Sequence, residues 1–243
     1  MIKRILVVGG ANGIGLAIAH ELALRESTEK VYIVDKSPLE ECNAHTKIES
    51  YLFDLTNEDY SFFDRFTDIN ALMITAGFGR LSLFKDIEEQ HIIDSFNVNT
   101  IPTLRLIKRF YPRLESNNDF YCGVMDSIAG WMTSPFLSVY GATKAALKIF
   151  IESVNVELIK SGSPNVILNV SPGYIKGTRF YSGQNNLEEL HDITTEILQH
   201  LEAKDDVYIP KYEEVYKDVL SRYHEDFRRE GLHSYDYKNK SIR

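Results

Sequence analysis

Apolar residues fall in short continuous runs, and longer stretches that mix apolar and polar positions separate these runs. A continuous Val/Ile/Leu-rich run is typical of a strand covered on both faces. Such runs lie at residues 5–8, 31–34, 51–53, 71–75, 119–125, 165–170 and 207–209. The longer stretches predict helices at about residues 13–25, 88–114, 139–159 and 187–201, the second of them interrupted near Pro102 and Pro112. This alternation predicts an α/β fold, a doubly wound parallel sheet with helices on both faces.

The pattern changes after Gly173. The charged segment 213–230 repeats Tyr, Val, Leu and Phe at helical spacing, which predicts an amphipathic packing or interface helix and not a binding element. The polar residues 234–243 are expected to be frayed. No repeat, linker or low-complexity block divides the chain, so we expect a single domain over residues 1–243. Its substrate loop would lie at about 174–205, and its C-terminal helix and tail at about 211–243.

Composition narrows the class of protein. With 243 residues, 44% of them hydrophobic, the chain can bury a full core. The net charge of -8 argues against nucleic acid or an anionic membrane as a partner. The two cysteines, Cys42 and Cys122, are far apart and fit a reducing compartment, and the His residues lack metal-ligand spacing, so no metal is expected. The first apolar run is short for a signal peptide, and no run reaches the length of a membrane span, which together predict a cytoplasmic protein.

A glycine-rich turn follows the first predicted strand. The sequence GGANGIG places Gly9, Gly13 and Gly15 between that strand and a helix. Glycine permits positive φ and lets backbone N–H groups approach a pyrophosphate, to which the helix adds its positive N-terminal dipole. The turn alone is also compatible with a tight strand-to-helix connection that binds nothing.

Two acidic residues at later strand ends favour a dinucleotide. Asp35 closes the second run, where a carboxylate would bind the adenosine ribose hydroxyls and repel a 2′-phosphate. This favours NAD as the cofactor, whereas the adjacent Lys36 leaves NADP open. Asp54 ends the third run and could reach the adenine edge. The alternatives are a cap or turn before Pro38 for Asp35, and the N-cap of a following helix for Asp54.

The segment SIAGWMTSPFLSVYGATKAAL combines a hydroxyl, a phenol and an amine. Tyr140 and Lys144 are four residues apart and share a helix face, and Ser127 precedes the tyrosine by thirteen residues. A phenol has a pKa near ~10, which a neighbouring cation lowers by stabilising the phenolate. The serine hydroxyl could orient a carbonyl or alcohol oxygen beside it. The segment can therefore bind an oxygen and exchange its proton while a cofactor carries hydride.

Taken together, these motifs resemble the short-chain dehydrogenase/reductase family. The similar motifs are GGANGIG, Asp35, DL at Asp54, TAG at Thr75, NVN at Asn97, SIAG at Ser127, YGATK, and SPG at Ser171, in family order from residue 5 to about 180. The resemblance implies an oxidoreductase that interconverts secondary alcohols and ketones with NAD, or with NADP as the alternative. It also implies a homodimer or homotetramer formed through the two long helices.

The resemblance assigns roles to individual positions. Tyr140 would be the general acid/base, Lys144 would bind the nicotinamide ribose and lower the tyrosine pKa, Ser127 would hold the reacting oxygen, and Asn99 would bind a water that relays protons from Lys144. The residues that would bind the cofactor are Gly9, Asn12, Gly13, Ile14, Gly15, Asp35, Asp54, Leu55, Ala76, Gly77, Tyr140, Lys144, Pro172, Gly173, Ile175 and Thr178.

Four positions depart from the family pattern. Val8 replaces a usual Thr before the glycine turn, and Thr75 stands where an Asn usually precedes AG, so a contact that steadies the central strands is in question. Asp126 replaces a common second Ser. Gly177 occupies the place of a Thr that contacts the nicotinamide carboxamide, with Thr178 one position later. None of these changes removes a group that proton transfer needs.

The expected substrate loops are rich in aromatic residues. They supply Trp131, Met132, Phe136, Tyr174, Phe180 and Tyr181, which would suit an apolar or aromatic alcohol or ketone. Packing against a loop or a second subunit is the alternative. Arg179 could meet a carboxylate or be solvated. Two other functions on the same fold are a catalytically silent nucleotide-binding regulator, which the intact Ser–Tyr–Lys set disfavours, and an epimerase or dehydratase, which the glycine spacing disfavours.

Overall fold

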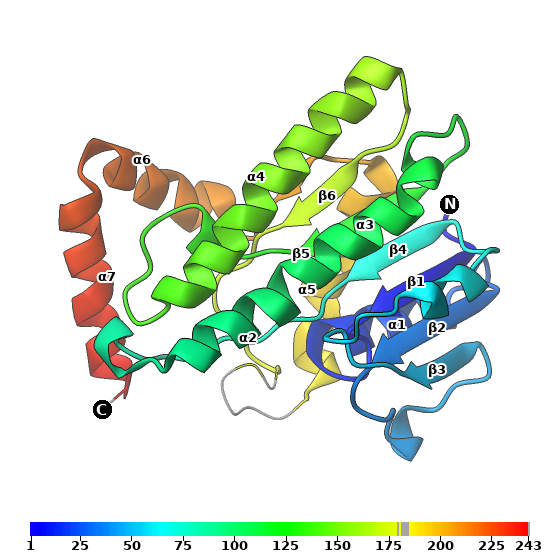
Figure 1. The fold of residues 1–243 in the computed structure, drawn as a ribbon, viewed down its shortest axis with the longest axis horizontal. Helices are drawn as coiled ribbons and strands as arrows, with labels where there is room; N and C mark the ends of the chain where they lie inside the picture. Colours follow the sequence, from blue (N-terminus) through cyan, green and yellow to red (C-terminus); the bar gives the residue numbers. More distant parts are fainter. Residues whose placement is uncertain (179, 181–184, 243) are drawn as a thin grey trace.

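A single parallel sheet forms the centre of the molecule (Figure 1). The computed structural model describes residues 1–178, 180 and 185–242. The strands are β1 (Arg4–Val8), β2 (Lys30–Asp35), β3 (Ile48–Leu52), β4 (Ala71–Ile74), β5 (Tyr121–Met125), β6 (Ile167–Val170) and β7 (Val207–Tyr208). They form a 7-stranded sheet in the order β3-β2-β1-β4-β5-β6-β7, and every neighbouring pair is parallel. The predicted doubly wound sheet is confirmed, and its order reverses direction between β1 and β4, where ligands bind in such folds.

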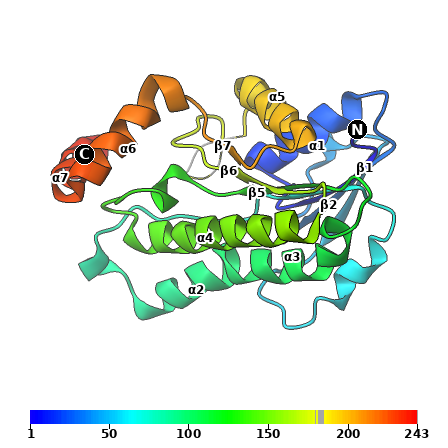
Figure 2. The same cartoon turned by 90° about the horizontal axis from the view of Figure 1, so that it is seen from above.

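Helices cover both faces of the sheet (Figure 2). One face carries α2 (Glu89–Asn99), α3 (Ile101–Leu114) and α4 (Ser138–Ser161), and the other carries α1 (Gly13–Leu24) and α5 (Leu187–Ala203). Short 3-10 helices lie at Glu41–Asn43, Ser61–Arg65, Phe84–Asp86 and Ile128–Gly130. Within the residues described, no helix combines the length and apolar composition needed to cross a bilayer.

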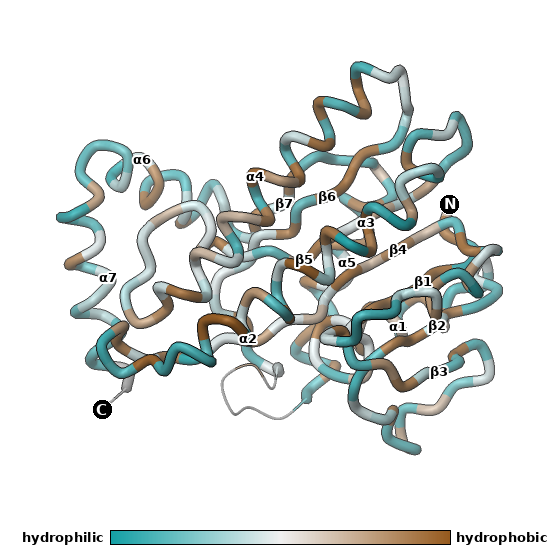
Figure 3. Tube along the Cα trace, in the orientation of Figure 1, coloured by the Kyte–Doolittle hydropathy of each residue, from teal (hydrophilic) through white to brown (hydrophobic). Residues whose placement is uncertain are grey.

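The central strands are largely apolar because both of their faces are buried, whereas Leu52 of the edge strand β3 is 65% exposed (Figure 3). In β1, Leu6 and Val8 join the core beneath α3 and α4, whereas Ile5 and Val7 join the core beneath α1 and α5. All four are fully buried, and each contributes about 1.5–3 kcal/mol relative to exposure. This two-sided burial explains why the strands appear in the sequence as continuous apolar runs.

The long predicted helix at residues 88–114 is two helices. The break falls at Thr100, which ends α2 and caps α3, and Pro102 lies in the first turn of α3. Proline lacks an N–H, so it is tolerated in a first turn but not within a continuous helix. The expected interruption at Pro112 is wrong, because α3 continues through it to Leu114.

The C-terminal segment differs from both predictions made for it. A π-helical turn (Tyr212–Tyr216) leads into α6 (Lys217–Glu225), and a second helix, α7 (Phe227–Ile242), follows. Asp226 divides them: its backbone is extended, and its carboxylate accepts from the N–H groups of Arg228 and Arg229 at the start of α7. The single helix at 213–230 is therefore wrong, and the tail expected to be frayed is helical.

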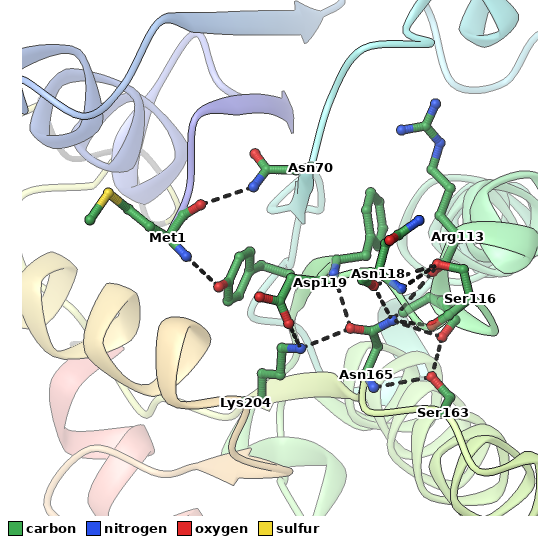
Figure 4. A network of polar contacts seen from close by, with 12 residues as sticks. Met1, Asn70, Arg113, Ser116, Asn118, Asp119, Ser163, Asn165 and Lys204 are labelled. Atoms are coloured by element: carbon green, nitrogen blue, oxygen red, sulfur yellow. Dashed lines mark hydrogen bonds and ion pairs between the residues drawn. The ribbon is translucent and has the colours of Figure 1, made fainter.

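A buried amide fixes the edge of the sheet opposite the glycine turn (Figure 4). Asn165 is fully buried; its Oδ1 accepts from the Phe120 backbone N–H at 3.0 Å and from Lys204 Nζ at 2.9 Å. Its Nδ2 donates to carbonyl oxygens around the end of α3, including that of Leu114 at 3.2 Å. These hydrogen bonds hold the amino ends of β5 and β6 together. The site lies at the other, carboxyl ends of the strands.

Candidate active site

A cavity of about 870 Å³ opens at the carboxyl ends of the strands. Its lining runs from the ends of β2 and β3, past the glycine turn and the ends of β4 and β5, to α4, α6 and α7. Of the residues predicted to bind cofactor or to catalyse, all line this cavity except Asn99. The structure therefore brings the sequence motifs together in one place.

Glycine is required where the turn meets β4. Gly9 has φ of 87°, and a Cβ there would lie 2.4 Å from the Ala76 backbone N. A Cβ at Gly15 would lie 2.3 Å from the carbonyl oxygen of Gly9. A larger residue at either position would clash with the backbone and displace the turn. These glycines therefore let the turn pack closely at the base of the cavity.

The N-terminus of α1 already binds an oxygen atom. Gly13 has φ of 54°, and its N–H donates to Asn185 Oδ1 at 2.9 Å. Asn185 Nδ2 in turn donates to Asn12 Oδ1 at 3.2 Å. A Cβ on Gly13 would meet only Thr178, at 3.7 Å, so space remains above the turn. An oxygen acceptor at a glycine-rich helix start is the contact that a pyrophosphate makes, and this turn fits a dinucleotide.

Thr75 supplies the strand contact that the sequence left in question. Its hydroxyl is close to the carbonyl oxygens of Val8, at 3.1 Å, and Gly9, at 2.9 Å, and can donate to either. Its backbone N–H also donates to Val8 O at 2.8 Å. The end of β4 is therefore fixed to the glycine turn by a threonine in place of an asparagine.

Gly177 is also explained by its geometry. It has φ of 76°, in the left-handed region, and a Cβ would lie 3.0 Å from the Asn186 carbonyl oxygen. A threonine would be strained at this position. The hydroxyl of the next residue, Thr178, donates to Ile175 O at 3.2 Å, and its side chain faces Gly13.

The two acidic residues at the strand ends line the cavity on the side of β2 and β3. The carboxylate of Asp35 accepts from the backbone N–H groups of Ala11 at 3.0 Å and Ser37 at 2.9 Å, so it joins the glycine turn to the end of β2. Asp54 accepts from the N–H and the hydroxyl of Thr56, and these bonds, with nearby Lys36, hold its pKa below the usual value. The short 3-10 helix Ser61–Arg65 is the next helical element, so Asp54 is not a helix cap.

Ser127, which follows β5, and Tyr140 and Lys144, on α4, line the same cavity as Asp35. Ser127 is 6% exposed; its Oγ accepts from Ala129 N–H at 3.2 Å and lies 3.4 Å from the Pro172 carbonyl oxygen. Lys144 Nζ lies 5.7 Å from the centre of the Tyr140 ring and donates to Met125 O at 2.7 Å. The lysine is 2% exposed, and burial lowers its pKa.

A buried carboxylate faces this lysine. Asp126 is 1% exposed, and its Oδ2 accepts from Asn169 Nδ2 at 3.0 Å. Its Oδ1 has no hydrogen-bond partner among the residues described. Burial raises the pKa of Asp126 to about 6, against the attraction of Lys144 and, more weakly, Lys148. The negative charge in turn raises the pKa of Lys144, opposing the effect of burial.

Asn99 lies behind the cavity wall and not on it. It is fully buried at the end of α2, where its Oδ1 accepts from Phe78 N–H and its Nδ2 donates to Phe78 O, each at 2.9 Å. Nδ2 also donates to Thr143 Oγ1 at 3.2 Å. The side chain therefore clamps the loop after β4 to the first half of α4.

The C-terminal helices line the cavity, which the sequence pattern did not predict. Residues of this segment in the lining are Tyr216, Val219, Arg222, Glu230, His233, Ser234, Tyr237 and Lys238. The segment packs on the loop after Ser127: the ring centres of Tyr235 and Phe136 lie 4.8 Å apart, and Lys238 Nζ donates to Ser134 Oγ at 2.6 Å. The predicted packing role is confirmed by these contacts, whereas the place of the segment in the cavity wall was not predicted, because amphipathic spacing does not identify what the apolar face packs against.

The aromatic residues of the predicted substrate loops divide into two groups. Met132, Tyr174 and Phe180 line the cavity, and the Phe180 ring lies 5.3 Å from that of Tyr140. Trp131 packs with Ile128, Ile209 and Leu220, and its Nε1 donates to Ser171 Oγ at 2.8 Å. The Phe136 ring packs against the ring of Tyr235. Arg179 and Tyr181 lie outside the described residues.

Known proteins share both the sequence pattern and the fold. The 11-beta-hydroxysteroid dehydrogenase 1A of Arabidopsis thaliana is 28% identical over 214 residues, which cover 79% of this chain and 59% of the relative. The chain thus spans about three fifths of the length of that relative. A short-chain dehydrogenase from Streptomyces avermitilis has a TM-score of 0.76 at 19% identity, over 99% of this chain and 100% of that one. The structure of ElxO with NADP bound has a TM-score of 0.70 at 19% identity, over 87% and 99%.

The family profile described as short chain dehydrogenase matches residues 3–188, from β1 to the start of α5. This range contains the glycine turn, Asp35, Ser127, Tyr140 and Lys144. The chain therefore belongs to the short chain dehydrogenase family.

Proposed function

We propose that the protein is an oxidoreductase that transfers hydride between NAD(H) and a secondary alcohol or ketone. The observation that carries this proposal is that Ser127, Tyr140 and Lys144 line the same cavity as the glycine turn. A tight turn that binds nothing would not need a proton-transfer set beside it. The family and its hydroxysteroid dehydrogenase relative support the same reaction class.

Each residue has a distinct part in the proposed reaction. A bound nicotinamide cofactor supplies the hydride acceptor or donor. Ser127 holds the substrate oxygen, and Tyr140 takes the alcohol proton during oxidation and returns it during reduction. The positive charge of Lys144, at 5.7 Å from the phenol ring, favours the phenolate form of Tyr140. Asn99 keeps α4 and the loop after β4 in register, and the water relay assigned to it stays a prediction.

Asp35 supports NAD as the preferred cofactor. Its carboxylate is fixed at the end of β2 by two backbone N–H groups, where a ribose 2′-phosphate would meet a negative charge. Lys36 also lines the cavity and is exposed, which keeps an NADPH-dependent carbonyl reductase as the second candidate.

Parallel titrations with NADH and NADPH, followed by nicotinamide fluorescence and by thermal stabilisation, test this choice. We expect tighter binding of NADH, and a shift toward NADPH in Asp35→Ser. Preference for NADPH in the unaltered protein would select the second candidate. Binding of neither cofactor would refute the enzyme proposal.

The assembly expected from the family also stays a prediction. Ile149 and Val156, on α4, are 59% and 65% exposed, and Ile159 on the same helix is 65% exposed. An unpartnered apolar helix side of this kind is compatible with a homodimer or homotetramer.

A further inference from the structure

The wall that α7 contributes to the cavity contains a lysine that has no carboxylate partner in the part of the chain that the structure describes. Lys238 of α7 lines the cavity together with Ser134 and Tyr237. Its Nζ donates to Ser134 Oγ at 2.6 Å and to the Pro135 carbonyl oxygen at 3.1 Å. An ammonium group has three N–H donors, so one remains for a third acceptor.

The other charges of this wall are already paired. Arg222 Nε donates to Glu230 Oε2 at 2.8 Å, and Glu230, 8% exposed, also lies 3.7 Å from His233 Nδ1. Among the residues described, no carboxylate lies within ion-pair distance of Lys238. Burial without a counter-charge lowers the pKa of Lys238 to about 8. Counting only the residues that the structure describes, this wall carries one positive charge with no carboxylate beside it, in a protein whose net charge is -8.

The position of this charge relates it to the reacting end of the cavity. The acceptors of Lys238, Ser134 and Pro135, belong to the loop that joins Ser127 to the helix that carries Tyr140. The same cavity is also lined by the apolar side chains of Met132 and Val219. A ligand in contact with Ser127, these apolar side chains and Lys238 would meet a hydroxyl group, an apolar surface and a cation.

We propose that the substrate is an amphipathic alcohol or carbonyl compound that carries a carboxylate, and that Lys238 binds this carboxylate. The inference rests on the proposed function, since it concerns the substrate of the same site. A carboxylate would supply the third acceptor and the missing negative charge, and charge-assisted hydrogen bonds are about twice as strong as neutral ones. The contact between α7 and the loop would then become part of substrate binding.

The test uses two aldehydes with the same formylphenyl group, 4-formylbenzoate, which carries a carboxylate, and its methyl ester, which is neutral. For each probe, kcat/KM is measured with the preferred reduced cofactor, and Kd is measured by calorimetry on protein saturated with the oxidised cofactor. We expect the unaltered protein to favour 4-formylbenzoate in both measurements. In Lys238→Met this preference should fall by about 10- to 100-fold, while values for the ester change little.

Two further variants separate recognition from structure. Lys238→Arg keeps the charge and should retain most of the preference, whereas Lys240→Met removes an exposed lysine from the same helix and should leave both probes unaffected. If Lys238 only ties α7 to the loop, Lys238→Met will lower both probes equally. That result, or the absence of any preference for the carboxylate in the unaltered protein, overturns the inference. Cofactor titration and turnover of the neutral ester judge the proposed function separately.

Discussion

Replacing Asp126 by asparagine should stabilise the protein at neutral pH and not at acid pH. The side chain is 1% exposed, and in the described part of the chain its Oδ1 accepts no hydrogen bond. An ionised carboxylate in such a place lacks the solvation that it has in the unfolded chain. The pKa of Asp126 is therefore raised to about 6, from an ordinary value of 3.8.

The size of the effect follows from linkage between proton binding and folding. Because the folded-state pKa is raised, the folded protein holds the proton more tightly than the unfolded chain does, and its stability falls as pH rises from about 4 through 6. A shift of about 2 units corresponds to about 3 kcal/mol at pH 7. Asp126→Asn removes this titration. Its free energy of unfolding, relative to that of the unaltered protein, should rise by about 3 kcal/mol between pH 4 and pH 7.

Urea unfolding followed by circular dichroism at several pH values between 4 and 7 measures this difference. Comparing the change with pH in each protein removes contributions that do not depend on pH, such as the different hydrogen bonding of the amide. Asp236→Asn, which removes a carboxylate from the exposed surface of α7, is the matched control and should follow the unaltered protein. Parallel pH profiles for Asp126→Asn and the unaltered protein would refute the reasoning.

Two further predictions concern the lysine and the glycine turn. Lys144→Ala should weaken cofactor binding and slow turnover together, because the same ammonium group would bind the nicotinamide ribose and stabilise the phenolate. Cofactor titration and kcat, measured on one preparation, check this prediction. An unchanged cofactor Kd would contradict it. Thr75→Val should lower the free energy of unfolding by about 1–2 kcal/mol and weaken cofactor binding, because the hydroxyl contacts of Thr75 with the Val8 and Gly9 carbonyl oxygens are lost. Thr195→Val is the control, since the buried hydroxyl of Thr195 has no partner within the described residues, and an equal loss of stability in both variants would contradict the explanation.

The sheet could be predicted from the sequence because its signal is local. A strand buried on both faces must be continuously apolar, and the four apolar residues 5–8 directly before a glycine turn are typical of such a strand. The breaks in the helices were harder to place. The end of α2 depends on Thr100, two residues before Pro102, whereas Pro112 is accommodated in the last turn of α3.

The glycine turn was predicted more fully than the wall that the C-terminal helices form. Residues 9 and 15 must be glycine because a Cβ at either position would clash with nearby backbone atoms. The glycine pattern in the sequence therefore predicts the shape of the turn. The role of α7 depends instead on long-range contacts, such as those of Tyr235 with Phe136 and of Lys238 with Ser134, which join residues about a hundred positions apart. No local pattern in the polar tail indicates that it would fold onto the cavity.

The role of Asp126 also could not be read from its position. The sequence showed only that a carboxylate stands beside Ser127 where a hydroxyl is common. Its burial, its bond to Asn169 and its proximity to Lys144 depend on how β5, β6 and α4 pack together. Asp126, which departs from the family pattern, thus places a second ionisable group next to Ser127 and Lys144.

That Tyr140 transfers the substrate proton is the central proposal for this site. Its most direct test is to measure kcat and the cofactor Kd of Tyr140→Phe beside those of the unaltered protein, with the alcohol or ketone that the unaltered protein turns over. The variant keeps the aromatic ring that packs against Phe180 and loses only the hydroxyl. We predict a fall in kcat of several orders of magnitude with nearly unchanged cofactor affinity. Retained turnover, or an equal loss of turnover and cofactor binding, would contradict the claim.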